Sequence, residues 1–317
     1  MFDFTPANRP TIYFVGVTTG KSSIMNVFPR WAKALGLDDA VIRGFDLPLH
    51  APPEQYRAVV DFMKRDPLSL GALVTTHKLD LFAACRDQFD YIDPYAEKLG
   101  EVSSLSKRGD AFCAHAKDPI SSGLAMEHFV PPNFWKDHGG EVLLLGAGGS
   151  ALAMSLYLTQ QKFAGNMPRR IILVNRSLPR LESARRILDG LSPHVEFVYK
   201  HQSAPVDNDA LIAALPPYSM IVNATGLGKD APGSPTGDTV LYPKHSLVWE
   251  INYRGDLIFM YQAQKQAKER QLHVEDGWVY FIHGWTQVIA EVFDIPIEGE
   301  TLQRMSDIAM EMIGGKA

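Results

Sequence analysis

The stretch EVLLLGAGGSALA, residues 141–153, decides the fold. Its first half is an apolar run typical of a fully buried parallel strand, and the residues after the glycines have helical composition. A glycine-rich turn at this junction brings backbone N–H groups and the positive end of a helix dipole to one point, which suits a pyrophosphate. We therefore predict a nucleotide-binding cofactor loop made of Gly146, Ala147, Gly148, Gly149 and Ser150. The alternative is a turn without a ligand.

Strands and helices alternate on both sides of this stretch. Downstream, strand-like runs lie at residues 169–175, 195–200, 219–225 and 247–253; upstream they lie at 11–17, 40–47 and 70–76, with a hairpin at 102–116. Such alternation predicts an α/β protein with parallel sheets. We expect an N-terminal α/β domain at residues 1–118, a doubly wound Rossmann-type domain at 119–277, and two C-terminal helices at 278–317 that return to the first domain.

The strand after the cofactor loop discriminates between nucleotides. An NAD site usually has an acid at the end of this strand, to bind the ribose 2′-hydroxyl. Here the clamp segment, residues 175–180, offers Asn175, Arg176, Ser177 and Arg180 instead. Arginine grips a phosphate with two parallel hydrogen bonds, so these residues favour NADP over NAD. The alternative is a solvated helix start. Further on, Asn223, Ala224 and Thr225 end a strand at the cofactor side of the sheet, and we call residues 223–225 the nicotinamide-side loop.

Composition excludes several classes of protein. With 31 basic and 36 acidic residues the net charge is −5, which argues against a nucleic acid as the main partner. No apolar run is long enough for a transmembrane helix, and the N-terminus does not resemble a secretory signal. Cys85 and Cys113 form no disulfide framework, so we expect a cytoplasmic protein. The ten histidines show no metal-binding spacing, and no metal site is predicted.

Over most of its length the chain resembles the shikimate/quinate dehydrogenase family. The segments that carry the resemblance, in the family's order, are GVTTGKSSIMN, GALVTTHK, GEVSSL, AHAKDPISSGL, GAGGSALA, NRSLPR, NATGLG, EINYRGDLIF and GWVYFIHGWTQ. The resemblance implies an NADP-dependent dehydrogenase of the shikimate pathway. It implies Lys78 and Asp118 as catalytic residues, and substrate contacts from Ser22, Ser23, Thr75, Ser103, Tyr253, His283 and Gln287.

The substrate half departs from the family's pattern. Leu73 and Ser103 stand where the family has asparagines, and residues 116–119 differ around Asp118. The family's glutamine position falls on Gly284, with His283 beside it and Gln287 about one turn later. The departures leave the chemistry in place and put shikimate itself in question as the substrate.

Lys78 and Asp118 suit the oxidation of a secondary alcohol. The lysine exchanges a proton with the carbinol oxygen, and the carboxylate orients it and holds the substrate; a surface ion pair is the alternative. The nearby hydroxyls and imidazole suit a polyhydroxylated ring. We predict an NADP-dependent oxidoreductase acting on a cyclic hydroxy acid, as a monomer or homodimer. Two alternatives stay open: a methylene-tetrahydrofolate dehydrogenase-like enzyme on the same fold, and a non-catalytic NADP-binding regulatory protein.

Overall fold

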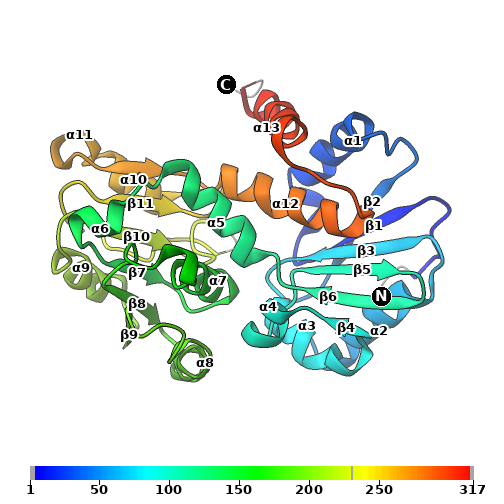
Figure 1. The fold of residues 1–317 in the computed structure, drawn as a ribbon, viewed down its shortest axis with the longest axis horizontal. Helices are drawn as coiled ribbons and strands as arrows, with labels where there is room; N and C mark the ends of the chain where they lie inside the picture. Colours follow the sequence, from blue (N-terminus) through cyan, green and yellow to red (C-terminus); the bar gives the residue numbers. More distant parts are fainter. Residues whose placement is uncertain (1–3, 230, 315–317) are drawn as a thin grey trace. The chain divides into compact units, whose positions relative to one another are not determined.

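The computed structural model describes residues 4–229 and 231–314, and the chain divides into two compact units (Figure 1). The first unit contains the residues up to Lys117 and those from Ile282 onward, and the second contains Asp118–Phe281. The predicted divisions followed residues 118 and 277, whereas the units divide after Lys117 and within helix α12, Trp278–Phe293. Asp118 is therefore the first residue of the second unit.

The first unit is built on a mixed sheet with the strand order β2-β1-β3-β5-β6-β4. Strand β1 pairs in parallel with β2 and β3, while β5 runs antiparallel to β3 and β6. The pair β5–β6 is the hairpin predicted at residues 102–116. The strands are β1 Thr11–Gly16, β2 Val41–Asp46, β3 Ser69–Val74, β4 Tyr91–Ile92, β5 Ser104–Arg108 and β6 Ala111–His115.

Local sequence signals explain where two helices of this unit begin. Helix α2 begins at Pro53, where the fixed φ of proline suits the first turn. Helix α4 begins after Asp93, whose carboxylate accepts from Ala96 N at 2.6 Å. Ser23 stands at the N-cap of α1 but makes no side-chain capping bond. The helices are α1 Ile24–Ala34, α2 Pro53–Arg65, α3 Lys78–Cys85, α4 Pro94–Leu99 and α13 Gly299–Gly314, with short 3₁₀ turns at Thr19–Lys21 and Arg86–Gln88.

The end of the chain completes the first unit. Helix α13 lies beside α1 (Figure 1), and Trp31 of α1, which is fully buried, donates its indole N–H to Met305 O at 2.8 Å. Phe28 of α1 stacks on Phe293 of α12, with ring centroids 6.3 Å apart. These contacts bury apolar surface that residues 4–117 alone leave open.

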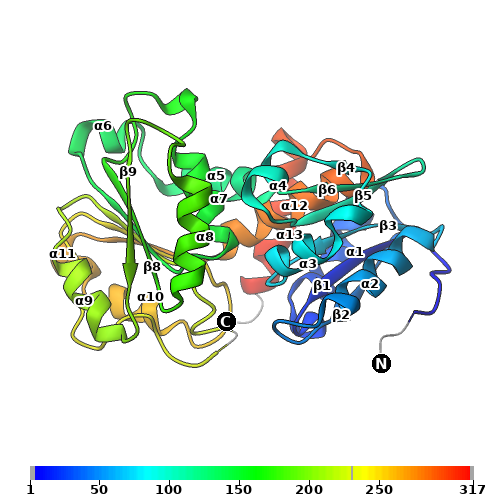
Figure 2. The same cartoon turned by 90° about the horizontal axis from the view of Figure 1, so that it is seen from below.

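The second unit has the doubly wound topology that the sequence predicts. Its parallel strands follow the order β12-β11-β10-β7-β8-β9, with the first strand in sequence, β7, at the centre. Figure 2 shows α7 and α8 on one face of this sheet and α9 and α10 on the other. The strands are β7 Val142–Leu145, β8 Arg170–Asn175, β9 Glu196–His201, β10 Met220–Asn223, β11 Leu247–Glu250 and β12 His273–Glu275.

Every residue of β7 is buried, which is why the strand reads as an unbroken apolar run. On one face, apolar residues of the central strands pack against Ile212 of α9 and Phe259 of α10. The helices of this unit are α5 Asp118–Phe129, α6 Phe134–His138, α7 Gly149–Leu158, α8 Leu178–Leu188, α9 Pro205–Ala213, α10 Ile258–Gln264 and α11 Ala267–Arg270, with a 3₁₀ turn at Gln161–Phe163. The α/β fold class is confirmed.

Some elements lack a clear sequence signal. Helix α5 buries small and polar residues on several sides, and its Gly123 lies against the ring of Tyr157 in α7, so it shows no single apolar stripe. Strands β4 and β12 are too short to show alternation. Within residues 4–229 and 231–314, none of the helices combines the length and apolar character that a bilayer span requires.

Candidate functional site

The cofactor loop lies between β7 and α7. Gly146 has φ +122°, and a β-carbon there would stand 2.6 Å from the carbonyl oxygen of Ala224. Only glycine fits this position, because both the backbone conformation and the contact exclude a side chain. Gly148 is the N-cap of α7, so the first-turn N–H groups of a ten-residue helix face the loop. This is the arrangement that accepts a pyrophosphate.

The clamp segment is ordered by its own hydrogen bonds. Asn175 Oδ1 accepts from Ser177 N at 2.9 Å, and Ser177 caps α8 by accepting from Arg180 N at 3.4 Å. Arg176 is exposed, and its carbonyl oxygen lies 3.0 Å from Nε2 of His201 at the end of β9. The strand end carries no acid, which fits a 2′-phosphate better than a 2′-hydroxyl. His201 joins the segment through strand pairing, a contact that sequence spacing does not show.

A buried carboxylate holds the nicotinamide-side loop. Glu250, at the end of β11, is fully buried; its Oε2 accepts from Asn223 Nδ2 at 2.7 Å. Its Oε1 accepts from the backbone N of Asn252 at 2.9 Å and from Nδ2 of the same residue at 2.7 Å. Asn223 Oδ1 in turn accepts from Thr225 N at 3.1 Å. Burial raises the pKa of Glu250 to about 7, although these donors favour its charged form.

Asp118 is positioned at the start of α5 and is 6% exposed. The hydroxyl of Tyr280, in the first turns of α12, lies 3.3 Å from Asp118 Oδ2 and 3.4 Å from Ser150 Oγ of the cofactor loop. All three residues belong to the second unit. Tyr280 is not predictable as a site residue from the sequence, because nothing local distinguishes it from a packing tyrosine. Tyr253 is half-buried among aromatic rings, 4.5 Å from the ring centroid of Phe281.

Lys78 lies in the first unit, as the first residue of α3 just beyond β3. The turn before it is unusual: Thr76 has φ +51°, and His77 is buried with its Nδ1 3.0 Å from the hydroxyl of Tyr56. Burial lowers the pKa of His77 and so favours its neutral form. Thr75, half-buried, faces Gly16 at the carboxyl ends of β3 and β1. Thr75 and Lys78 thus both lie in the short connection that follows the carboxyl end of β3.

The remaining predicted substrate residues lie in three separate parts of the chain. Ser22 is buried and Ser23 half-buried before α1, while His283 and Gln287 lie half-buried on α12. Ser103 is buried, and its Oγ accepts from the backbone N of Lys117 at 2.7 Å. This bond gives Ser103 a part in fixing the segment before Asp118.

Gln287 lines a pocket of about 450 Å³ within the first unit. On the same pocket Glu291 accepts from Lys117 Nζ at 2.5 Å and from Arg108 at 2.8 Å, and lies 3.3 Å from His115 Nε2. Burial raises the pKa of Glu291, but Lys117, His115 and Arg108 outweigh it and leave that pKa below its ordinary value. The Glu291 carboxylate thus connects α12 to β5, to β6 and to the residue that follows β6 by two positions.

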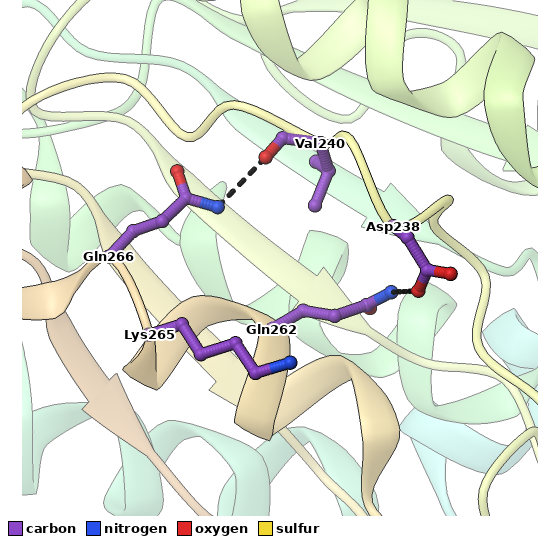
Figure 3. A pocket seen from close by; sticks show the side chains of 5 residues that line it. All are labelled: Asp238, Val240, Gln262, Lys265 and Gln266. Carbon is purple, nitrogen blue, oxygen red and sulfur yellow. Dashed lines mark hydrogen bonds between the residues drawn. The ribbon is translucent and has the colours of Figure 1, made fainter.

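A second pocket, of about 380 Å³, lies in the second unit (Figure 3). Its polar side chains hold the preceding segment: Gln266 Nε2 donates to Val240 O at 2.8 Å, and Gln262 Nε2 lies 3.4 Å from Asp238 Oδ1. No predicted site residue is among the five that line it, which are Asp238, Val240, Gln262, Lys265 and Gln266. Among the described residues there is also no group of three or more potential metal ligands.

Comparison with known proteins gives relatives at modest identity. No protein-family model matches the chain. It is 26% identical over 285 residues to a shikimate dehydrogenase (NADP(+)) of Methylobacterium radiotolerans, covering 86% of this chain and 88% of the relative. Among solved structures, shikimate dehydrogenase 1 of Peptoclostridium difficile superposes with a TM-score of 0.70 at 15% identity, covering 95% of this chain and 98% of the other.

The same fold also occurs with another activity. A 5-ketofructose reductase of Gluconobacter sp. strain CHM43 superposes with a TM-score of 0.66 at 18% identity, over 96% of this chain and 100% of the other. These structural likenesses concern the fold alone. The resemblance to the shikimate/quinate dehydrogenase family that the sequence predicts is confirmed.

Proposed function

We propose that this shikimate dehydrogenase-like chain is an NADP-dependent oxidoreductase that interconverts a secondary alcohol and a ketone on a cyclic hydroxy acid. The observation that carries the proposal is the second unit's nucleotide site. A glycine-only turn leads into α7, and a strand end without an acid is followed by Arg176 and Arg180. The curated relative is named for NADP, in agreement with this site.

The residues of the second unit fit the nucleotide. The cofactor loop and the first turn of α7 would hold the pyrophosphate, and the clamp segment the 2′-phosphate. The nicotinamide-side loop would face the reacting end. When bound, NADP⁺ accepts the hydride that leaves the carbinol carbon as the carbon–oxygen double bond forms.

We assign the proton chemistry to Lys78 and Asp118. In the oxidation direction neutral Lys78 takes the hydroxyl proton as the hydride leaves, and in the reduction direction the ammonium returns it to the carbonyl oxygen. Asp118 is proposed to accept a hydrogen bond from the substrate hydroxyl and so hold the substrate. Ser22, Ser23, Thr75, Tyr253, His283 and Gln287 are proposed to contact the ring hydroxyls and carboxylate. Ser103 is proposed to contribute through its remaining hydrogen-bonding capacity.

The substrate is proposed to be a relative of shikimate rather than shikimate itself. Leu73 stands at an asparagine position and is 8% exposed, so it offers no amide to a ligand. Gly284 likewise offers no side chain where the family has a glutamine. Losing hydrogen bonds that a site makes to a substrate sharply lowers kcat/KM for that substrate. We therefore expect weak turnover of shikimate.

The test is an assay of the purified protein with NADP⁺ and a panel of cyclic hydroxy acids, followed by NADPH absorbance. We expect turnover of one panel member well above that of shikimate. Efficient oxidation of shikimate would contradict the substrate assignment. NADP binding without turnover of any member would favour the non-catalytic regulatory alternative, and turnover of a folate substrate would favour the methylene-tetrahydrofolate dehydrogenase-like one.

We also propose a cytoplasmic monomer or homodimer whose partner is the small-molecule substrate, without a nucleic-acid partner. The two cysteines support a reducing location, because both are buried free thiols. Burial raises the pKa of Cys85 to about 12, which makes it a poor nucleophile. Sedimentation velocity would give the oligomeric state.

A further inference from the structure

Tyr280 is the residue that contacts both halves of the proposed machinery in the second unit. Its hydroxyl lies 3.3 Å from Oδ2 of Asp118, the proposed catalytic carboxylate, and 3.4 Å from Oγ of Ser150 in the cofactor loop. Both oxygen–oxygen distances are long for hydrogen bonds. Hydrogen bonds in catalytic sites are often long before ligands bind and shorten in the complex. One phenol group therefore contacts both the proposed catalytic carboxylate and the proposed cofactor loop.

The direction of the hydrogen bonds follows from the donors available. An ionised carboxylate only accepts, and a phenol has one proton. The hydroxyl of Tyr280 is the donor to both Asp118 Oδ2 and Ser150 Oγ, so these two acceptors compete for its single proton. The bond to the charged carboxylate is the stronger of the two. The result is one phenol proton that can go either to the cofactor loop or to Asp118.

The position of Tyr280 is fixed by packing. Its ring meets the indole of Trp249 edge-on, with centroids 5.6 Å apart. Trp249 is fully buried in β11, and its indole N–H donates to Asp276 O at 3.0 Å. The phenol is thus held by the sheet, and its hydroxyl is presented at a fixed place.

We propose that Tyr280 is a positioning residue that orients the Asp118 carboxylate and couples that orientation to the cofactor loop. The proposal rests on the proposed function. A nucleotide phosphate is a strong acceptor, so it would accept a hydrogen bond from the Ser150 hydroxyl when it occupies the loop. Ser150 Oγ then becomes a better acceptor and draws the Tyr280 proton away from Asp118, because bonds in a chain polarise one another. Occupancy of the loop is thereby transmitted to the carboxylate.

The first test is Tyr280→Phe, which removes the hydroxyl and keeps the ring on Trp249. We expect kcat to fall about 10-fold, as for a lost hydrogen bond to a charged group, with the Kd for NADP changed less than about 2-fold because a positioning role spares cofactor binding. The matched control is Tyr199→Phe, which removes a hydroxyl donating to Asp189 at 2.8 Å. An equal kcat loss in the control, or an unchanged kcat in Tyr280→Phe, overturns the proposal.

The second test does not depend on turnover, so its failure is distinguishable from failure of the proposed function. The carboxyl-carbon resonance of Asp118 is followed by NMR in protein labelled at aspartate. We expect NADP to shift this resonance in the wild type, and the shift to be abolished in Tyr280→Phe and in Ser150→Ala but kept in Tyr199→Phe. A resonance that responds to NADP equally in all four proteins overturns the coupling, whatever the substrate proves to be.

Discussion

At the scale of single residues, Lys78 is the side chain on which the proposed chemistry depends most directly. We expect Lys78→Ala to lower kcat by about 10²–10⁴-fold, the usual contribution of a general acid–base group. The Kd for NADP should be nearly unchanged, because the proposed nucleotide contacts all lie in the second unit. Steady-state kinetics and separate titration calorimetry check both quantities, with the exposed Lys33→Ala as control. A near-normal kcat on the true substrate would remove Lys78 from the mechanism.

The choice of nucleotide is a second property of single residues. Arg176→Asp would place a carboxylate against the 2′-phosphate, so we expect its Kd for NADP to rise far more than its Kd for NAD. The exposed Arg65→Asp, on α2 of the first unit, serves as control for a general effect of charge reversal. An equal loss for the two nucleotides, or a wild type that prefers NAD, would contradict the assignment of NADP.

Local patterns made the glycine turn and the clamp segment predictable, since both consist of residues close together in the chain. The carbonyl group of Ala224 leaves no room for a side chain at position 146, a contact that the sequence does not show. The strand–turn–helix pattern around Gly146 was nevertheless sufficient to predict its role. Tyr280 and Glu250 were not predictable in the same way. Their partners lie 162 positions away at Asp118 and 27 positions away at Asn223, so only the fold brings them together. An acid ending an apolar strand was the one available signal for Glu250.

At the scale of elements, the sequence predicted strands and helices where burial imposes a regular pattern. Strand β7 is buried on both faces, and it reads as a continuous apolar run. Helix α5 eluded prediction because it packs on more than one side with small residues. Strands β4 and β12 form because they pair with neighbouring strands, and their own few residues show no strand pattern.

The ends of β10 and β11 should make stability depend on pH. The pKa of Glu250 is raised from 4.5 to about 7 in the folded state, so the unfolded chain binds fewer protons between these values. Its contribution to stability is therefore present below about pH 4.5 and is lost as the pH rises through about 7, to the extent of about 3 kcal/mol.

Glu250→Gln removes this ionisation, so the melting temperature of the variant should fall less than that of the wild type between pH 5 and pH 8. The comparison uses calorimetric melts of both proteins in matched buffers. Glu196→Gln, at an exposed position of β9, serves as control. Parallel pH dependence in wild type and Glu250→Gln would show that the carboxyl group is not protonated near neutrality.

At the scale of the whole molecule, the two units differ in how the chain builds them. The second unit is a continuous segment with its own sheet and core, so we expect residues 118–281 produced alone to melt cooperatively and to bind NADP within about 10-fold of the full-length Kd. Residues 1–117 alone should melt without a cooperative transition, because Trp31 and Phe28 would lack their contacts with α13 and α12. Circular dichroism melts and titration calorimetry test both expectations. A non-cooperative second unit would show that the two units depend on each other for folding.

This discontinuity of the first unit has a consequence for synthesis on the ribosome. Its sheet emerges first, but α13 emerges last, after the whole of the second unit has been translated. At about 5–20 residues per second the delay is roughly ten to thirty seconds. During that time the second unit can fold to completion, while the indole N–H of Trp31 has no carbonyl of Met305 to donate to. A nascent chain stalled before α13 should therefore be the species that holding chaperones recognise, through the apolar surface of α1.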